Sequence, residues 1–261
     1  MIRDRVLGHA APLEGATLLD VGAGDGLIGL AALERVGPNG TVIFSDVSEA
    51  LLAHSEQRAD SLGLSDRARF VHTAAEDLAA IPDASVDVVT TRSVLIYVAE
   101  KSQAFAAFAR VLRPGGRLSL FEPINRLVFP EPDDRFWGYD IGAVAGLAAR
   151  VRAQFTGASR DVRAMMGFDD RDLADLAVAA GFERVHVERH IDVEPGSSMN
   201  PVSFDALLDS APNPNAPSTR EAIAAALTED EQERFLTELR SAFDEGRATR
   251  RMVGAYVAAQ K

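Results

Sequence analysis

The sequence predicts an α/β fold with a mostly parallel sheet covered by helices. Apolar runs with strand character alternate with helical patterns through the first half of the chain, which is the order that parallel strands joined by crossover helices require. The chain has 261 residues, of which 47% are hydrophobic. This is enough for a sizeable core, so we expect a single domain over residues 1–261.

Five strands are expected in the first half of the chain. They span residues 17–21, 41–46, 69–73, 86–91 and 118–122. The helices expected between and before them cover residues 2–9, 27–36 and 100–112, with a further helix capped by Ser48 and ended by Gly63. The segment Arg113-Pro114-Gly115-Gly116 is expected to be a tight turn, because proline fixes φ and glycine accepts a positive φ.

The pattern changes after the fifth strand. Residues 123–168 combine prolines and aromatic residues without a strand pattern, and we expect them to form an insertion. A helix over 169–180 and a sixth strand over 184–193 follow. A second insertion covers about 196–248 and carries helical patterns, and a seventh strand spans 251–258. Both insertions start from strands of the sheet, so we expect them to act as lids.

Composition disfavours some classes of protein and excludes others. The formal net charge is −12, whereas nucleic-acid binders normally carry a basic face, so no nucleic-acid partner is expected. The chain has no cysteine, which excludes disulfides, thiolate nucleophiles and zinc sites with cysteine ligands. No apolar run reaches the roughly 18 residues needed to cross a bilayer, and the N-terminus lacks the apolar run of a signal peptide. We therefore expect a cytoplasmic protein without a membrane partner.

The most informative segment is Leu19-Asp20-Val21-Gly22-Ala23-Gly24-Asp25-Gly26. A strand runs directly into glycines and then into a helix. Glycine allows a sharp bend and close approach of a ligand, and the helix N-terminus offers free N–H groups that suit a carboxylate or phosphate. Asp46 ends the second strand about 20 residues later, where an acid that binds ribose hydroxyls is expected. Because Gly24-x-Gly26-x-x-Gly29 also matches the dinucleotide fingerprint, a nicotinamide-dependent oxidoreductase remains an alternative.

Three segments together resemble a known family. Leu19 to Gly26 is similar to the first motif of class I S-adenosylmethionine-dependent methyltransferases. Glu76-Asp77-Leu78 stands where that family often has an adenine-contacting segment, and residues 112–118 resemble its turn before the fifth strand. The resemblance covers most of residues 17–122, and the strand at 251–258 fits the family's closing strand. It implies a Rossmann-like sheet of seven mostly parallel strands with an antiparallel last strand, helices on both faces and helical lid insertions.

The resemblance also implies a cofactor and roles for particular residues. The cofactor would be S-adenosyl-L-methionine, with S-adenosyl-L-homocysteine as the product. Asp20, Gly22 and Gly24 would line its methionine part, and Asp46 would bind the ribose. The residues beside the adenine would be Ala75 and Glu76, while Arg92 would lie near the methionine carboxylate. The family's acid before the Ala-Glu pair is Ala74 here, so the adenine contacts are less well defined than the loop.

The acceptor is expected to be a small molecule similar to a secondary metabolite, methylated on an O, N or C atom. Without cysteine, covalent catalysis at a pyrimidine is excluded. Ligands of open α/β sheets bind beyond the carboxyl ends of the strands. The expected acceptor contacts are therefore Ser93, Tyr97, Glu122 and Asn125, with Trp137 and Tyr139 of the first insertion as an aromatic wall.

Several features stay unassigned at this level. No catalytic residue is evident, because methyl transfer depends mainly on orientation of the acceptor. No metal site is expected, since His186, Glu188 and His190 share a strand face simply by their spacing. Cofactor binding without methyl transfer is an alternative function. Only a short helix precedes the first strand, so a roof over the acceptor would come from the insertions or from a second subunit in a homodimer.

Overall fold

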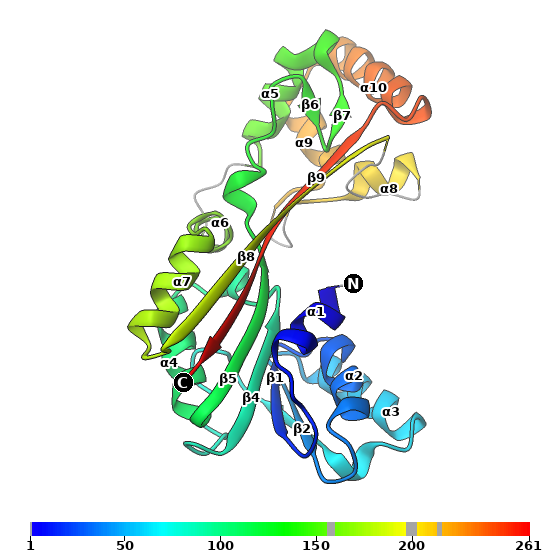
Figure 1. The fold of residues 1–261 in the computed structure, drawn as a ribbon. Coiled ribbons are helices and arrows are strands. Elements are labelled where there is room, and N and C mark those ends of the chain that lie inside the picture. Colours follow the sequence, from blue (N-terminus) through cyan, green and yellow to red (C-terminus); the bar gives the residue numbers. More distant parts are fainter. Residues whose placement is uncertain (1, 156–159, 197–202, 213–215) are drawn as a thin grey trace. The chain divides into compact units, whose positions relative to one another are not determined.

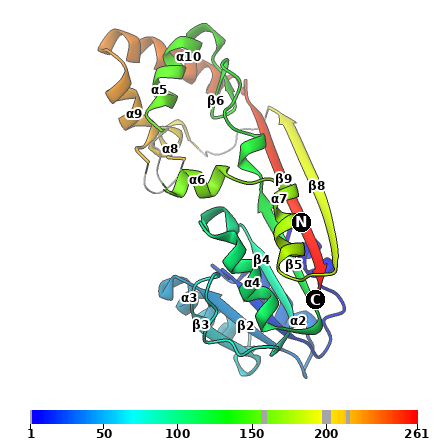
Figure 2. The ribbon, with the colours of Figure 1, turned by 90° about the vertical axis from the view of Figure 1, so that its left-hand side faces the viewer.

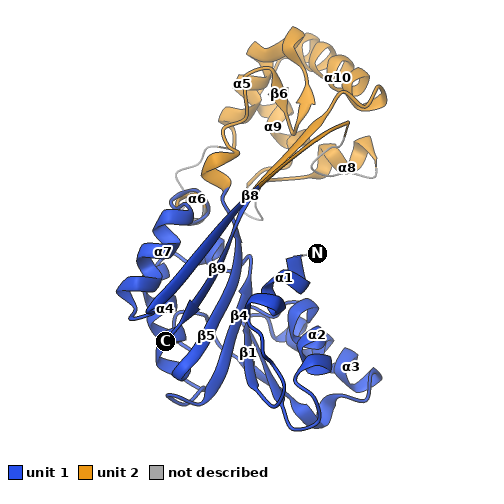
Figure 3. Cartoon of the chain, in the orientation of Figure 1, with its two compact units in different colours: residues 1–124, 164–190, 254–261 blue, residues 125–163, 191–253 orange. Residues whose placement is uncertain are grey.

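A computed structural model of the chain describes residues 2–155, 160–196, 203–212 and 216–261 (Figure 1). The chain forms two compact units (Figure 3). Unit 1 comprises residues 1–124, 164–190 and 254–261, and unit 2 comprises residues 125–163 and 191–253.

Unit 1 is built on a seven-stranded sheet with the strand order β3-β2-β1-β4-β5-β9-β8. The strands are β1 (Thr17–Val21), β2 (Thr41–Asp46), β3 (Ala68–His72), β4 (Val86–Arg92), β5 (Leu112–Pro123), β8 (Arg184–Pro195) and β9 (Thr249–Gln260). Strands β1 to β5 pair in parallel, and β9 pairs with β5 in the antiparallel direction. The predicted fold class, including the antiparallel last strand, is confirmed.

Helices cover both faces of this sheet (Figures 1 and 2). One face carries α1 (Ile2–His9), α2 (Leu27–Arg35) and α3 (Glu49–Ser61), and the other carries α4 (Lys101–Val111) and α7 (Asp170–Ala179). Their bounds agree with the expected helices to within one or two residues. Ser48 caps α3 as predicted, because its side chain accepts a hydrogen bond from the Leu51 N–H at 3.3 Å.

The predicted tight turn at residues 113–116 is wrong. These residues lie inside β5, where the register jumps from Val86 opposite Leu112 to Val88 opposite Arg117. The extra residues form a wide bulge in which Gly115 takes φ +78°. Lys261 closes the bulge, since its carbonyl accepts from the Gly115 N–H at 2.7 Å and its own N–H donates to the Gly116 carbonyl at 2.9 Å.

Unit 2 has a hydrophobic core of its own. Its helices are α5 (Ala145–Ala153), α8 (Phe204–Asp209), α9 (Thr219–Ala226) and α10 (Glu229–Asp244), and a hairpin of β6 (Arg135–Phe136) and β7 (Tyr139–Asp140) joins them. Buried side chains from both chain segments of the unit share one cluster, among them Phe136, Ile141, Phe204, Phe235 and Leu239. The expectation of no strand within 123–168 is wrong, because β6 and β7 have only two residues each and leave no alternating pattern.

Short elements connect these parts. They are η1 (Ser65–Arg67), η2 (Leu95–Tyr97), η3 (Asn125–Leu127), η4 (Gly142–Val144) and α6 (Arg160–Met166). Within the described residues no helix is both long and apolar enough to cross a membrane.

Candidate functional site

Four neighbouring parallel strands bring most of the predicted site residues to one edge of the sheet. The carboxyl ends of β1, β2, β3 and β4 lie at the same edge, because these strands pair in parallel. The glycine loop follows β1, Asp46 ends β2, the pair Ala75 and Glu76 follows β3, and Arg92 ends β4. The residues named from the sequence therefore form one constellation in unit 1.

The loop between β1 and α2 needs glycine for two separate reasons. Gly22, Gly24 and Gly26 take φ values of +65°, +56° and +84°, a region that favours glycine. At Gly22 a Cβ would lie 2.2 Å from Cγ2 of Val94, so the neighbouring side chain requires glycine there as well. At Gly24 a Cβ would meet nothing within 4 Å. The loop is thus packed at Gly22 and open at Gly24.

Asp46 links the end of β2 to this loop. Its carboxylate accepts from the Gly24 N–H at 2.9 Å through Oδ2 and from the Ser48 N–H at 2.9 Å through Oδ1. The residue is 8% exposed. Each carboxylate oxygen can accept a further hydrogen bond, so two adjacent hydroxyl groups are a suitable ligand for Asp46.

Asp20 holds the loop from the inner side. It is buried, and its carboxylate accepts from the Gly29 N–H and from the Thr90 hydroxyl, both at 2.9 Å. Burial raises the pKa of Asp20 to about 7, although these hydrogen bonds and the nearby Arg92 act in the opposite direction. The carboxylate ties α2 to β4. Contact between Asp20 and a ligand stays a prediction.

Sequence reasoning missed Ser55 as a further support of the loop. Its hydroxyl donates to the Gly24 carbonyl at 2.8 Å from the buried face of α3. The available signal was a serine in a helical stripe that also contains Leu52 and Ala59. Together with Asp46, this bond fixes both the N–H and the C=O of Gly24.

Arg92 has a side chain free to take an anion. No hydrogen-bond or ion-pair partner of its guanidinium is found in the described part of the chain. It lies close enough to Asp20 to lower the pKa of that carboxyl group. After β3, Ala75 is buried and Glu76 is half-buried, and Arg110 fixes the following loop by donating to the carbonyls of Asp77 and Leu78.

Comparison with known proteins decides the family. A family model described as a methyltransferase domain matches residues 18–116. Nocamycin O-methyltransferase of Saccharothrix syringae is 32% identical over 195 residues, which are 73% of this chain and 67% of that protein. A ubiquinone/menaquinone biosynthesis C-methyltransferase of Stutzerimonas stutzeri (strain A1501) is 32% identical over 174 residues, 66% of either chain.

The chain belongs to the class I S-adenosylmethionine-dependent methyltransferases. A tRNA 5-carboxymethoxyuridine methyltransferase of Escherichia coli (strain K12) is 36% identical over 117 residues, which are 45% of this methyltransferase and 43% of the relative. The crystal structure of a SAM-dependent methyltransferase from Aquifex aeolicus is similar to this chain with a TM-score of 0.51 and 21% sequence identity. The match covers 70% of this chain and 80% of that chain. S-adenosylmethionine is the cofactor of this family, so the oxidoreductase alternative is set aside.

The residues of the methyltransferase that were expected to contact the acceptor fall in both units. Ser93, Tyr97 and Glu122 belong to unit 1, whereas Asn125, Trp137 and Tyr139 belong to unit 2. Ser93 takes φ +57°, an unusual conformation for a residue with a side chain, directly after β4. Tyr97 is 62% exposed. Contact with an acceptor stays a prediction for all six.

Glu122 is enclosed by protein groups rather than open to a ligand. It is 0% exposed, and its carboxylate accepts from the N–H groups of Val94, Leu95 and Ile96 at 2.9, 3.0 and 3.2 Å. Burial raises the pKa of Glu122 to about 7 against the effect of these bonds. The residue therefore fixes the start of η2, and Val94 in turn packs against Gly22 of the cofactor loop.

Lys101 adds a buried cation to the same region. Its ammonium group donates to the carbonyls of Val98 at 2.9 Å and Ala164 at 2.8 Å, and it lies 4.5 Å from the centre of the Phe168 ring. Burial lowers the pKa of Lys101, whereas the charge of Glu122 raises it. The pair Glu122 and Lys101 thus supports the segment between β4 and α4.

The two aromatic residues named from the first insertion have packing roles in unit 2. Tyr139 is buried in the core of that unit, and its ring centre lies 5.6 Å from that of Phe243. Trp137 donates from Nε1 to the Thr219 hydroxyl at 2.9 Å. Both side chains are occupied by these contacts, so an aromatic wall is not evident in this arrangement.

The polar face of β8 makes ion pairs with α1. Glu188 lies 3.4 Å from both Arg5 and His9, and His186 and His190 are also 3.4 Å from it. These contacts lower the pKa of Glu188. Within the described residues no group of three or more histidine, aspartate or glutamate side chains has the arrangement of a metal site.

Proposed function

We propose that this methyltransferase transfers the methyl group of S-adenosylmethionine to an oxygen, nitrogen or carbon atom of a small-molecule acceptor. The observation that carries the proposal is the loop of residues 22–26 after β1, which is open at Gly24 and bordered by Asp46. We call this loop together with Asp46 the corner after β1. The loop backbone is already fixed by Asp46, Asp20 and Ser55, so little ordering would accompany binding.

The residues of the corner fit the parts of the cofactor. Bound there, S-adenosylmethionine supplies a methyl group activated by a positively charged sulfur. Asp46 would accept hydrogen bonds from the ribose hydroxyls, and the free guanidinium of Arg92 would pair with the methionine carboxylate. Ala75 and Glu76 would lie beside the adenine. Gly24 allows the ligand to approach the backbone closely.

The protein's part in the reaction is orientation. The residues that hold the cofactor would align its methyl group with an electron pair of the acceptor, a lone pair on O or N or a π pair on C, and the electron pair of the broken carbon–sulfur bond would remain on sulfur. Correct alignment of two reactants can contribute about 7–11 kcal/mol to such a step. No general base is required for an acceptor that reacts as an anion, which is consistent with the lack of an assigned catalytic residue.

Three observations support a small molecule as acceptor. The net charge of −12 disfavours a polyanion. In the most basic stretch of the chain, Arg150 pairs with Glu231 at 2.6 Å and Arg152 lies 3.7 Å from Asp133, so both charges are already balanced. The relatives with the more extensive matches are named for nocamycin and for ubiquinone/menaquinone biosynthesis, and the tRNA methyltransferase matches over less than half of its length.

We further propose that unit 2 is needed for turnover and not for cofactor binding. The corner described above consists only of residues of unit 1, and unit 2 has a separate core. The insertions at 123–168 and 196–248 would then act as lids over the acceptor.

Labelled methyl transfer tests the proposed function. The full chain is incubated with S-adenosylmethionine labelled in the methyl group, together with phenols, quinols, amines and carboxylic acids or with bulk tRNA. We expect label in at least one small acceptor and none in tRNA. Label in tRNA alone would contradict the proposed acceptor class. Binding of S-adenosylhomocysteine without any transfer would favour a protein that holds the cofactor without methylating.

A further inference from the structure

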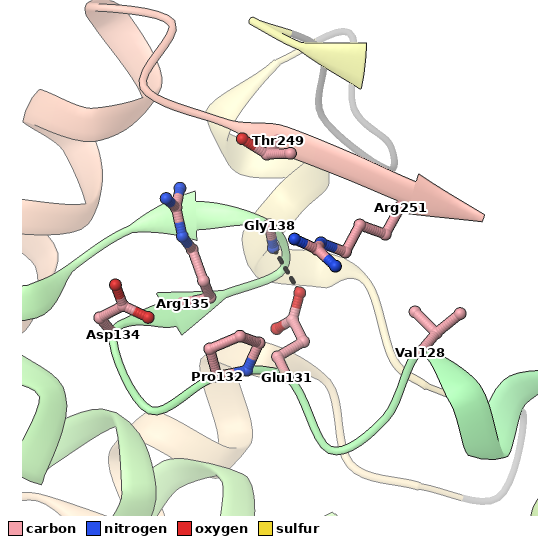
Figure 4. A pocket seen from close by; sticks show the side chains of 8 residues that line it. All are labelled: Val128, Glu131, Pro132, Asp134, Arg135, Gly138, Thr249 and Arg251. Carbon is pink, nitrogen blue, oxygen red and sulfur yellow. Dashed lines mark hydrogen bonds between the residues drawn. The ribbon is translucent and has the colours of Figure 1, made fainter. Parts of the chain in front are cut away.

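Unit 2 contains a cavity that the proposed methyl transfer does not use. Its volume is about 260 Å³, and charged and polar residues line it, including Glu131, Asp134, Arg135, Gly138, Thr249 and Arg251 (Figure 4). All of them belong to unit 2. Two of them, Thr249 and Arg251, lie in the first part of β9, which belongs to unit 2.

A strained hairpin turn forms one side of this cavity. Trp137 and Gly138 join β6 to β7 and take φ +52° and +83°, the two positive values that a tight two-residue hairpin requires. Positive φ is unfavourable for a bulky residue such as tryptophan. At Gly138 a Cβ would lie 2.9 Å from the Thr249 carbonyl, so the cavity is lined there by bare backbone.

Glu131 stabilises that turn and is occupied by it. Its two carboxylate oxygens accept from the N–H groups of Trp137 at 2.8 Å and Gly138 at 2.7 Å. Burial raises the pKa of Glu131, while these bonds and the nearby Arg152 and Arg135 lower it. The carboxylate is therefore occupied by two backbone N–H groups, and it makes no hydrogen bond or ion pair with Arg135 or Arg251.

Arg135 and Arg251 are the groups available for a ligand. They come from β6 and β9, and Figure 4 shows their guanidinium groups on the two sides of Gly138. Neither has a hydrogen-bond or ion-pair partner among the residues that the structure describes. By contrast, Arg150, Arg220 and Arg247 of the same unit each pair with a carboxylate. Asp134 is the acid of this lining whose carboxylate has no partner among the described residues, so the unpaired groups of the cavity carry two positive charges and one negative charge.

We propose that the cavity of unit 2 binds a small molecule through a carboxylate or phosphate group held between Arg135 and Arg251. Guanidinium groups match the planar geometry of such oxyanions and can form two parallel hydrogen bonds to each. The Thr249 hydroxyl offers a further donor in the same lining. A volume of about 260 Å³ limits the ligand to a compact molecule. This site is additional to the methyl-transfer site and does not depend on it.

Binding of four simple probes tests the charge that the cavity accepts. The full chain is titrated at low ionic strength with inorganic phosphate, benzoate, benzamide and benzylamine, because salt weakens exposed charge interactions. The fluorescence of Trp137, the single tryptophan, reports on the turn that borders the cavity, and calorimetry gives the affinity. We expect benzoate or phosphate to bind and the neutral and cationic probes not to bind. Which of the two anions binds more tightly distinguishes a carboxylate from a phosphate ligand.

Variants assign the binding to the two arginines. Arg135→Gln and Arg251→Gln should each weaken anion binding by at least about tenfold, equivalent to about 1.4 kcal/mol. Arg220→Gln is the control, since this arginine of unit 2 pairs with Asp209 and does not line the cavity. Unchanged circular dichroism and an unchanged midpoint of thermal unfolding establish that the variants are folded. Preference for benzylamine, binding of no probe at millimolar concentration, or equal affinities in all variants would each overturn the proposal.

Discussion

Two aspartates next to the glycine loop differ in what their carboxylates can still bind. Asp20 is enclosed by the Gly29 N–H and the Thr90 hydroxyl, and it fixes the loop from inside. Asp46 accepts one N–H on each oxygen and keeps a small exposed fraction, 8%. We therefore propose a direct contact with the ribose for Asp46.

The substitution Asp46→Asn should weaken binding of S-adenosylhomocysteine by about tenfold or more. The amide replaces one accepting oxygen by an NH2 group that faces a backbone N–H, and hydrogen bonds to charged groups contribute about 1.5–3 kcal/mol. Calorimetric titration measures the effect. Asp66→Asn is the control, because Asp66 is an exposed aspartate of η1. Equal affinity in both variants would contradict the role of Asp46.

The sequence defines the positions of the candidate cofactor residues more closely than the surroundings of the candidate acceptor residues, for a physical reason. Asp46 and the glycines occupy fixed positions relative to strand ends, and strand ends can be read from apolar runs. The direction of the Glu122 carboxylate depends on three N–H groups of η2, which no pattern in the sequence reveals. The packing of Trp137 is equally hidden, because the hairpin that carries it has strands of only two residues and no detectable period.

The element most sensitive to a single side chain is η2. Its N–H groups are held by Glu122, and Val94 at its start fills the space beside Gly22. These contacts link Glu122, near the end of β5, through Val94 to Gly22 in the loop after β1. It gives Glu122 a positioning role for the cofactor corner although the carboxylate is enclosed.

Glu122 should make the stability of the protein depend on pH. Its pKa is about 7 when folded and near 4.3 when unfolded, so the folded state binds the proton more tightly. The corresponding stability is present below about pH 4.3 and is lost as the pH rises through about 7. Glu122→Gln removes this titration. We expect its free energy of unfolding to fall less than that of the wild type between about pH 5 and 8, by up to about 3 kcal/mol.

Denaturant unfolding at several pH values measures this difference. Asp20 has a raised pKa as well, so some slope remains in the variant. Glu183→Gln serves as the control, since Glu183 is exposed and its removal should leave the wild-type slope. Parallel slopes for Glu122→Gln and the wild type would show that the buried carboxyl group does not titrate in this range.

The bulge in β5 shows why element boundaries were predicted less well than the elements. Pro114 and Gly115 suit a turn, and local chemistry alone favours one. The C-terminal Lys261 pairs with the backbone of Gly115 and Gly116 and adds them to the sheet. Contact between residues so distant in the sequence is not visible in a local pattern.

At the scale of the whole molecule, the chain combines a cofactor-binding sheet with a second unit inserted into it. Unit 2 is made from two separate chain segments whose aromatic residues share one core. Loss of strand character indicates insertions in the sequence, whereas the common core of the two segments leaves no pattern there. Damage to that core should affect unit 2 selectively.

Phe235→Ala should abolish methyl transfer while leaving cofactor binding in place. Phe235 is 0% exposed and its ring centre lies 5.3 Å from that of Phe136, so truncation should cost unit 2 about 3–5 kcal/mol. Trp137 fluorescence reports on unit 2, calorimetry on S-adenosylhomocysteine binding, and label transfer on turnover. Val178→Ala, at an exposed apolar position of unit 1, should change none of them. Normal turnover with a loosened unit 2 would contradict the proposed role of this unit.

The open corner at Gly24 is tested most directly by titrating S-adenosylhomocysteine into the wild type, Gly24→Ala and Gly63→Ala. Gly24 and Gly63 take φ +56° and +68°, and a Cβ at either would meet nothing within 4 Å, so both variants carry a similar strain of about 1–2 kcal/mol. We predict that Gly63→Ala binds like the wild type and that Gly24→Ala binds at least about tenfold more weakly, because its methyl group stands where the ligand approaches. A wild type that ignores S-adenosylhomocysteine, or a Gly24→Ala variant that binds it as tightly as Gly63→Ala, would contradict the account.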